Sequence, residues 1–327
     1  MSERSVSAVA PDGVPEVRPG DDLAALLLAV TDVADGDIVV VTSKVVSKSE
    51  GRLIPGVDRD AAIAQESVRV VARRGPTSIV STRHGLTMAA AGVDNSNVAL
   101  GTLALLPLDP DDSARRLRTE ITARTGVRVA VVITDTAGRP WRQGQTDIAI
   151  GAAGLTVLDD HAGREDAHGN PLAVTAPAVA DEIAGLAELA SSKLGNRPFV
   201  VVSGLGDLVL ESGRHGPGAR ALIRPATEDL FGFGAREAVV RAMAGDQTDQ
   251  AYFGTPASAA EFSAALEQVT GLAAAAHRDG HVTLAGLDSR DSRLAPLAFA
   301  HGWTLEADGH ESDTDQGIGA RFRPSTP

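Results

Sequence analysis

The sequence predicts a mixed α/β protein, because short buried strands alternate with amphipathic helices along the chain. Three runs of branched residues have the length and character of buried strands: "DIVVVT" at 37–42, "VRVAVVIT" at 127–134 and "PFVVVSG" at 198–204. Between these runs, apolar residues recur at helical spacing, as in "GDDLAALLLAV". The alternation indicates helices packed on a sheet.

The elements before residue 245 follow one another in order. Asp21 or Asp22 opens a helix over "GDDLAALLLAV", and the strand at 37–42 is expected to end in a polar loop. Apolar residues at helical spacing predict a second helix over "AAIAQESVRVVARR". The remaining elements are the strand at 127–134, an apolar run at 155–158, a helix over about 179–194 and the strand at 198–204, which opens a glycine-rich loop.

A polar, turn-rich segment at 244–256, "AGDQTDQAYFGTP", predicts a linker, so we divide the chain near residue 250. The smaller part, 251–327, is expected to be a small α/β appendage. It contains an alanine-rich helix over 257–276, a strand at "HVTLAGL", a short helix at "SRLAPLAFAHG" and a flexible tail that begins at "DGHESD".

Composition limits the classes of function. Of the 327 residues, 43% are hydrophobic, which is enough for buried cores. A net charge of −13 argues against nucleic acid or an anionic membrane as a partner, because the field of the protein would repel polyanions. Cysteine is absent, so any metal must be held by oxygen or imidazole. The first residues lack the apolar core of a signal peptide, and we expect a cytoplasmic protein.

Two segments are candidates for binding charged ligands. "TSKVVSKSEGR", at 42–52, supplies two lysines, hydroxyl groups and a glycine, which suit a polyphosphate, although a solvated lysine-rich turn would have the same composition. "AAAGVDNSNVALG", at 89–101, gathers four polar side chains at a break between apolar runs. Asp94 of this segment either belongs to an ordinary turn or shares a divalent cation with a carboxylate from another loop.

The most specific segment is "ITDTAGRPWRQGQTD", which contains the end of the strongest predicted strand. Asp135 and Thr136 offer a carboxylate and a hydroxyl, which suit Mg²⁺ or Mn²⁺. Arg139 and Arg142 suit a phosphate or carboxylate ligand. The alternative is an Asx-turn in which an arginine stacks on Trp141.

Two further features give weaker signals. His161 and His168 lie in "DDHAGREDAHGNP", and their spacing fits neither a helical metal pair nor a zincin motif, so we expect loop residues. "GLGDLVLESGRHGPGAR" is either a mobile loop that wraps a nucleotide or a flexible surface loop.

Five segments, taken in this order, resemble the coenzyme F420:L-glutamate ligase (γ-glutamyl ligase) family: "GDIVVVTSKVVSKSEGR", "AAGVDNSN", "VVITDTAGRPWRQGQTDIAIGAAGL", "ADEIAGLAELA" and "LIRPATEDLF". The resemblance covers about residues 8–245 and is strongest to the N-terminal ligase half of the two-domain actinobacterial enzymes. It implies an unusual α/β fold with a nucleotide groove, assembled as a homodimer. It also implies that residues 1–250 form a GTP- and divalent-metal-dependent amide ligase. Such an enzyme adds L-glutamate to the lactyl carboxylate of the deazaflavin precursor, and then γ-linked glutamates, through an acyl phosphate with release of GDP and phosphate.

The resemblance also implies individual roles. By position, the residues that match GTP contacts are Val14, Pro15, Glu16, Val17, Ser43, Lys48 and Asn97. Asp94 and Asp135 match ligands of one metal and Thr136 a ligand of a second, so two Mg²⁺ or Mn²⁺ ions are expected, with K⁺ as a further candidate. Lys48 is expected to assist phosphoryl transfer, and we hypothesise that Arg139 or Arg142 binds the anionic acceptor or glutamate.

The sequence departs from the family at two places. The glycine-rich loop after Gly204 is longer than expected, so its nucleotide contacts are not assigned. Residues 251–327 do not resemble the flavin-binding domain fused to the actinobacterial enzymes, so no FMN is expected and no function is predicted for them. Two alternatives stay open: a metal-dependent phosphotransferase or nucleotide hydrolase, and a non-catalytic nucleotide-binding module.

Overall fold

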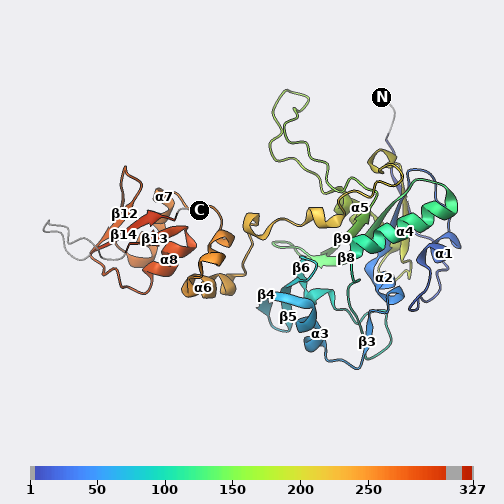
Figure 1. The fold of residues 1–327 in the computed structure, drawn as a ribbon, viewed down its shortest axis with the longest axis horizontal. Helices are drawn as coiled ribbons and strands as arrows, with labels where there is room; N and C mark the ends of the chain where they lie inside the picture. Colours follow the sequence, from blue (N-terminus) through green and yellow to red (C-terminus); the bar gives the residue numbers. More distant parts are fainter. Residues whose placement is uncertain (1–3, 307–318, 326–327) are drawn as a thin grey trace. The chain divides into compact units, whose positions relative to one another are not determined.

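The computed structural model describes residues 4–306 and 319–325, and within them the chain divides into two compact units at Ile223/Arg224. Both units combine helices with sheets, so the predicted mixed α/β class is correct (Figure 1). The expected division near residue 250 is too late in the chain. Helix α6 (Ala235–Ala244) packs against α8 (Leu294–Ala300), so it belongs to the second unit. None of the described helices is long and apolar enough to cross a bilayer.

The first unit is built on a five-stranded mixed sheet. Its strands, in spatial order, are β1 (Ser7–Val9), β10 (Phe199–Ser203), β2 (Ile38–Thr42), β8 (Ala130–Gly138) and β9 (Gln145–Ala153). Only β2 and β8 are parallel, with Thr42 opposite Thr134. This register places the residue that follows β2, Ser43, next to Asp135, because parallel strands run toward the same edge.

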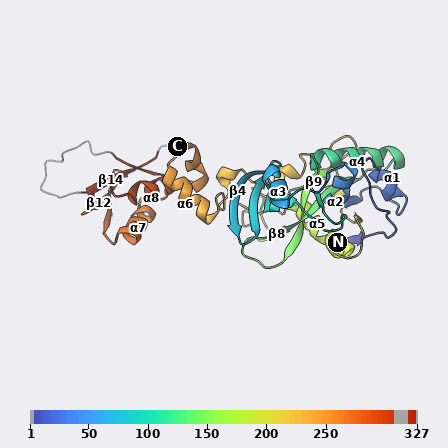
Figure 2. The same cartoon turned by 90° about the horizontal axis from the view of Figure 1, so that it is seen from below.

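Both faces of this sheet are buried, which explains the uninterrupted apolar run of β2. Val39 and Val41 face a core shared with α1 (Leu23–Leu28) and α4 (Pro110–Thr125). Ile38 and Val40 face the opposite core, shared with α5 (Val179–Ser191). Successive side chains of a strand alternate between faces, so a strand covered on both sides must be apolar at every position. Figure 2 shows α4 and α5 on opposite sides of β9.

Helix ends in this unit follow the local signals. The carboxylate of Asp22 caps α1 by accepting from the amide of Ala25, as expected for one of the two candidate residues. Helix α4 was not predicted, although Asp109 caps it and Pro110 begins it. Gly126 ends α4 with a left-handed backbone.

Two sequence predictions in this unit are wrong in type. The expected polar loop after β2 is helix α2 (Ser43–Ser49), because Val45 and Val46 are buried in the core beneath it. The expected helix over 61–74 is half helix and half strand. Helix α3 (Arg59–Glu66) ends where β4 (Ser67–Arg74) begins, because the β-branched end of the segment pairs with β5 (Thr77–Thr82).

Smaller elements complete the first unit. Strands β4, β5 and β6 (Thr87–Ala89) form one antiparallel sheet, and β3 (Leu53–Pro55) pairs with β7 (Thr102–Ala104) in another. Among the described residues of both units, the 3₁₀ helices are η1 (Ala90–Gly92), η2 (Gly206–Leu208), η3 (Ala219–Leu222), η4 (Ala226–Glu228) and η5 (Gln247–Phe253).

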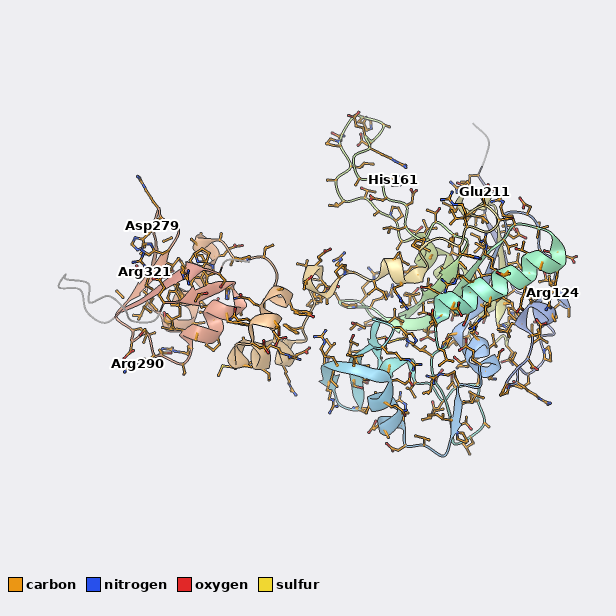
Figure 3. The ribbon with its side chains drawn as sticks, in the orientation of Figure 1. Arg124, His161, Glu211, Asp279, Arg290 and Arg321 are labelled. Atoms are coloured by element: carbon orange, nitrogen blue, oxygen red, sulfur yellow. The ribbon has the colours of Figure 1, made fainter. Side chains whose placement is uncertain are left out.

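The second unit has its own core and its own antiparallel sheet, in the order β11 (Ala274–Ala276), β12 (Val282–Ala285), β14 (Gly319–Pro324), β13 (Trp303–Leu305). Phe262 of α7 (Ala259–Thr270) stacks on Trp303 with ring centroids 4.9 Å apart. Asp279 marks the turn between β11 and β12 (Figure 3).

Three predictions for the second unit need correction. The alanine-rich helix stops at Thr270, because Gly271 is left-handed, and residues 274–276 form a strand. The expected linker contains η5. The expected tail includes strand β14, in which every second side chain, those of Ala320 and Phe322, points into the core. The part of that tail before residue 319 lies outside the described residues.

Candidate functional site

A groove of about 880 Å³ opens in the first unit where β2 and β8 approach their carboxyl ends. Five stretches that are distant in sequence line it, at 14–17, 42–48, 88–99, 134–147 and 188–198. Its size falls in the range of small-ligand pockets, and polar side chains dominate its floor. The parallel pairing of β2 with β8 is what brings the second and fourth stretches together.

Asp135 and Asp147 lie on the floor of the groove, on adjacent strands. Ser43 Oγ donates to Asp135 Oδ1 at 2.9 Å. Asp147 accepts hydrogen bonds from two hydroxyls of β8, Thr134 Oγ1 at 2.9 Å and Thr136 Oγ1 at 2.8 Å. Thr136 and Asp147 are directly opposite in the antiparallel register, so the sheet itself holds this pair. Asp135 lies within β8 and not after it, because β8 continues to Gly138.

Asp94 reaches the groove from the segment that follows η1. Its Oδ2 accepts from Lys44 Nζ and from Ser96 Oγ, both at 2.6 Å, and its Oδ1 accepts from the Ser96 amide at 2.9 Å. The turn before it is tight: Ala91 has φ +54° and Gly92 has φ +70°. A side chain at position 92 would collide with Leu106, so glycine is required for this approach.

The pKa values of Asp94 and Asp135 are shifted in opposite directions. Burial raises the pKa of Asp135 to about 6, and the negative charges of Asp147 and Asp94 add to this, against the hydrogen bond from Ser43. Burial also raises the pKa of Asp94, but hydrogen bonds from Lys44 and Ser96 outweigh it and hold the pKa at about 2. Asp135 is therefore the carboxylate that lacks charge compensation.

Two further lysines of the groove, Lys48 and Lys193, donate hydrogen bonds to oxygen atoms of other groove residues. Lys48, buried on α2, donates to Glu16 Oε1 at 2.5 Å and so ties the 14–17 segment to the helix. Lys193, which follows α5, donates to Thr136 Oγ1 at 3.0 Å. Positive charge is thus distributed along the groove in a protein whose net charge is negative.

Most of the sequence-predicted site residues line this one groove. They are Val14, Pro15, Glu16, Val17, Ser43, Lys48, Asp94, Asn97, Asp135 and Thr136. Their roles toward GTP and metal stay predictions. Arg139 and Arg142 are exposed in the turn between β8 and β9 and do not line the groove; Arg139 Nη2 donates to the Gln143 carbonyl at 3.1 Å.

The glycine-rich segment after Gly204 does not reach the groove. Arg118, buried on α4, donates to the carbonyl oxygens of Leu210 and Glu211, which attaches the segment to that helix. Figure 3 shows Glu211 in this segment and His161 in the long loop between β9 and α5. His161 and His168 are loop residues, as expected.

Lys44, Asp147 and Lys193 also line the groove and make hydrogen bonds to its other residues, and none of them was assigned a role from the sequence. Lys44 and Asp147 lie within quoted segments, but nothing in their spacing shows which side of an element they face. The antiparallel pairing of β8 with β9 was the missing information, since it places Asp147 against Thr136. Lys193 has no local signal.

The donor set suits a hard divalent cation. Asp94, Asp135 and Thr136 offer oxygen atoms to the groove. Burial, together with the charges of Asp147 and Asp94, raises the pKa of Asp135, and a bound cation would favour its ionised form. In the part of the chain that the structure describes, no three acidic or histidine side chains converge into a complete metal site.

The protein is of the mixed α/β class, and its first unit carries a polar groove lined by carboxylates, hydroxyls and lysines. The sequence matches the family model described as F420-0:Gamma-glutamyl ligase over residues 13–61 and 58–204, which fall in the first unit. The chain belongs to this family.

Individual relatives agree. A protein of Methanopyrus kandleri named coenzyme F420:L-glutamate ligase is 39% identical over 236 residues, 66% of this chain and 93% of that protein. Proteins with the same name from Methanothermobacter thermautotrophicus and Archaeoglobus fulgidus are 37% and 41% identical over 254 and 214 residues. These alignments cover 69% and 59% of this chain, and 98% and 86% of the relatives.

Proposed function

We propose that this protein is a GTP- and divalent-cation-dependent ligase that adds L-glutamate to the deazaflavin precursor of coenzyme F420. The first glutamate joins the lactyl carboxylate and later ones are γ-linked. The names of the relatives support the substrates. The observation that carries the proposal is the convergence of ten residues, matched by sequence to nucleotide and metal contacts, in one groove.

Different residues of the groove bind the nucleotide and the divalent cations. Ser43 and Lys48, on α2, bind the phosphates of GTP, and the 14–17 segment and Asn97 make further contacts with the nucleotide. Asp94, Asp135 and Thr136 hold divalent cations. When bound, these cations neutralise the phosphate oxygens during phosphoryl transfer. Asp147 orients the Thr136 hydroxyl by accepting a hydrogen bond from it.

The reaction requires two transfers. The γ-phosphoryl group of GTP passes to the acceptor carboxylate, which gives an acyl phosphate and GDP. The amine of glutamate then attacks the acyl carbon, phosphate leaves, and the amine loses a proton as the amide forms. Lys48 stabilises the charge on the transferring group, and no side-chain nucleophile is needed. Arg139 or Arg142 binds the anionic acceptor or glutamate, which requires the turn that carries them to move toward the groove.

Incubation with GTP, Mn²⁺ or Mg²⁺, L-glutamate and the deazaflavin acceptor tests the proposal by mass spectrometry. We expect the acceptor to gain glutamyl units, with one GDP formed per unit. GTP turnover that is independent of glutamate would support a phosphotransferase or hydrolase instead, and GTP binding without turnover a non-catalytic module. We also propose a homodimer, which light scattering coupled to size-exclusion chromatography tests.

A further inference from the structure

Lys44 closes the acidic end of the groove. Its ammonium group donates to Asp94 Oδ2 at 2.6 Å, to Ser96 Oγ at 2.6 Å and to the Ser96 carbonyl oxygen at 2.8 Å, which uses all three of its donors. Mg²⁺ lies about 2.1 Å from its oxygen ligands. A cation on the same side of Asp94 Oδ2 would therefore overlap the lysine nitrogen.

Lys193 occupies the corresponding position on Thr136. The hydroxyl of Thr136 gives its single proton to Asp147, so its lone pairs face the groove. Lys193 Nζ donates to this oxygen at 3.0 Å. A cation would bind to the same lone pair of the Thr136 oxygen that accepts the hydrogen bond from Lys193. Lys193 is exposed, so its ammonium group loses little by moving into solvent or onto a ligand.

We propose that Lys44 and Lys193 are resident counter-ions of the groove, which leave Asp94 and Thr136 when divalent cations bind and then contact the anionic substrates. The inference rests on the proposed function, in which Asp94 and Thr136 are cation ligands. It assigns individual substrate-binding roles to Lys44 and Lys193.

Charge supports the exchange. Three carboxylates, Asp94, Asp135 and Asp147, lie in the groove, and burying them without cations would be costly. The lysines reduce that cost while the groove has no ligand. Once released, each ammonium group carries three donors, which suit the oxygen atoms of a phosphate or carboxylate. Cation binding and anion binding should then strengthen each other.

Mn²⁺ titration without nucleotide, followed by the electron paramagnetic resonance signal of free Mn²⁺, tests the exchange. The variants are Lys44→Met and Lys193→Met, with Lys44→Gln as a second substitution in case the first does not fold. We expect each to bind Mn²⁺ about fivefold or more tightly than the wild type. The matched control is Lys48→Met. It removes the same charge one helical turn later on α2, from a lysine that contacts Glu16 and no cation ligand.

GDP titration provides the second measurement. Mn²⁺ should strengthen GDP binding to the wild type, and this gain should be smaller in Lys44→Met and Lys193→Met, because a released lysine no longer reaches the phosphates. An equal gain in all three proteins would contradict the release of the lysines onto the substrate.

Other outcomes separate this inference from the proposed function. Mn²⁺ affinity that is unchanged or weaker in both lysine variants overturns the exchange and leaves the cation ligands in place. Equal tightening in Lys48→Met also overturns it, because the effect would then be general electrostatics. If no protein binds Mn²⁺, with or without GDP, both the exchange and the cation assignment fail, while the glutamylation assay still decides the ligase activity.

Discussion

Asp94 and Asp135 line the same groove, yet the pKa of Asp94 is lowered to about 2 and that of Asp135 is raised to about 6. The cause lies in their partners. Lys44 and Ser96 donate hydrogen bonds to Asp94. Asp135 is buried beside two carboxylates, and Ser43, a neutral residue, donates to it. Substitutions at these two positions should therefore affect the cation-free protein in opposite directions.

Asp135→Asn should stabilise the cation-free protein at pH 7.5 by about 1–3 kcal/mol. The amide oxygen still accepts from Ser43, and the repulsion by Asp94 and Asp147 disappears. The folded wild type keeps a proton that the unfolded chain loses above its normal pKa of 3.8, so its stability should fall between about pH 4 and 6. Urea unfolding of both proteins in EDTA, at pH 7.5 and across the pH range of the wild-type loss, measures both effects. A variant that is less stable than the wild type at pH 7.5 would contradict the charge argument.

The same substitution should abolish the response to divalent cations. Mn²⁺ should raise the unfolding temperature of the wild type, because an ion that binds only the folded state stabilises it. Asp135→Asn should show little increase, and its glutamylation activity should be lost although its fold is more stable. Retention of full activity would refute the role of Asp135 as a cation ligand.

Asp94→Asn should destabilise the cation-free protein, by about 1 kcal/mol because this partly exposed pair is screened by solvent. The lowered pKa means that the ionised carboxylate contributes stability above pH 3.8, which is lost as the pH falls toward 2. Unfolding by urea at pH 7.5 should show the loss, and 1 M salt should reduce it. Stabilisation of the same size as in Asp135→Asn would show that Lys44 does not compensate Asp94.

Gly92→Ala should lower the unfolding free energy by about 2–4 kcal/mol. A Cβ atom there would lie 2.6 Å from Leu106 Cγ, and φ is +70°. Gly101→Ala is the matched control, since its φ is +79° but no atom lies within 4 Å of the new Cβ, so only about 1–2 kcal/mol of backbone strain applies. Equal losses in chemical unfolding would show that contact with Leu106 is not the cause. Only Gly92→Ala should also weaken Mn²⁺ binding, because it displaces Asp94.

A protein that ends at Ile223 should fold and keep ligase activity. The first unit holds the whole groove and its own cores, and the family match ends at residue 204. Cooperative thermal unfolding and glutamylation of the acceptor are the measurements. Loss of activity in a shortened protein that still unfolds cooperatively would assign the second unit a part in the reaction.

Local patterns predicted the elements that depend on nearby residues. The strands at 37–42 and 198–204 were found because a strand buried on both faces is apolar throughout, and α1 because Asp22 can cap it. The predictions failed where distant pairing decided the outcome. Residues 67–74 became a strand because β5 lies beside them, and residues 319–324 because β12 and β13 enclose them.

The sequence by itself determined the fold class, the family and ten of the residues that line the groove. Five segments match the family in the same order along the chain, and this match identifies the family and the site residues without coordinates. Only the tertiary structure decided that Asp147 fixes Thr136, that Lys44 compensates Asp94, and that Arg139 lies outside the groove. The physical reason is that hydrogen bonds and charge pairs depend on distances of a few ångströms between segments 11 to 50 residues apart, and strand register and turn geometry set those distances.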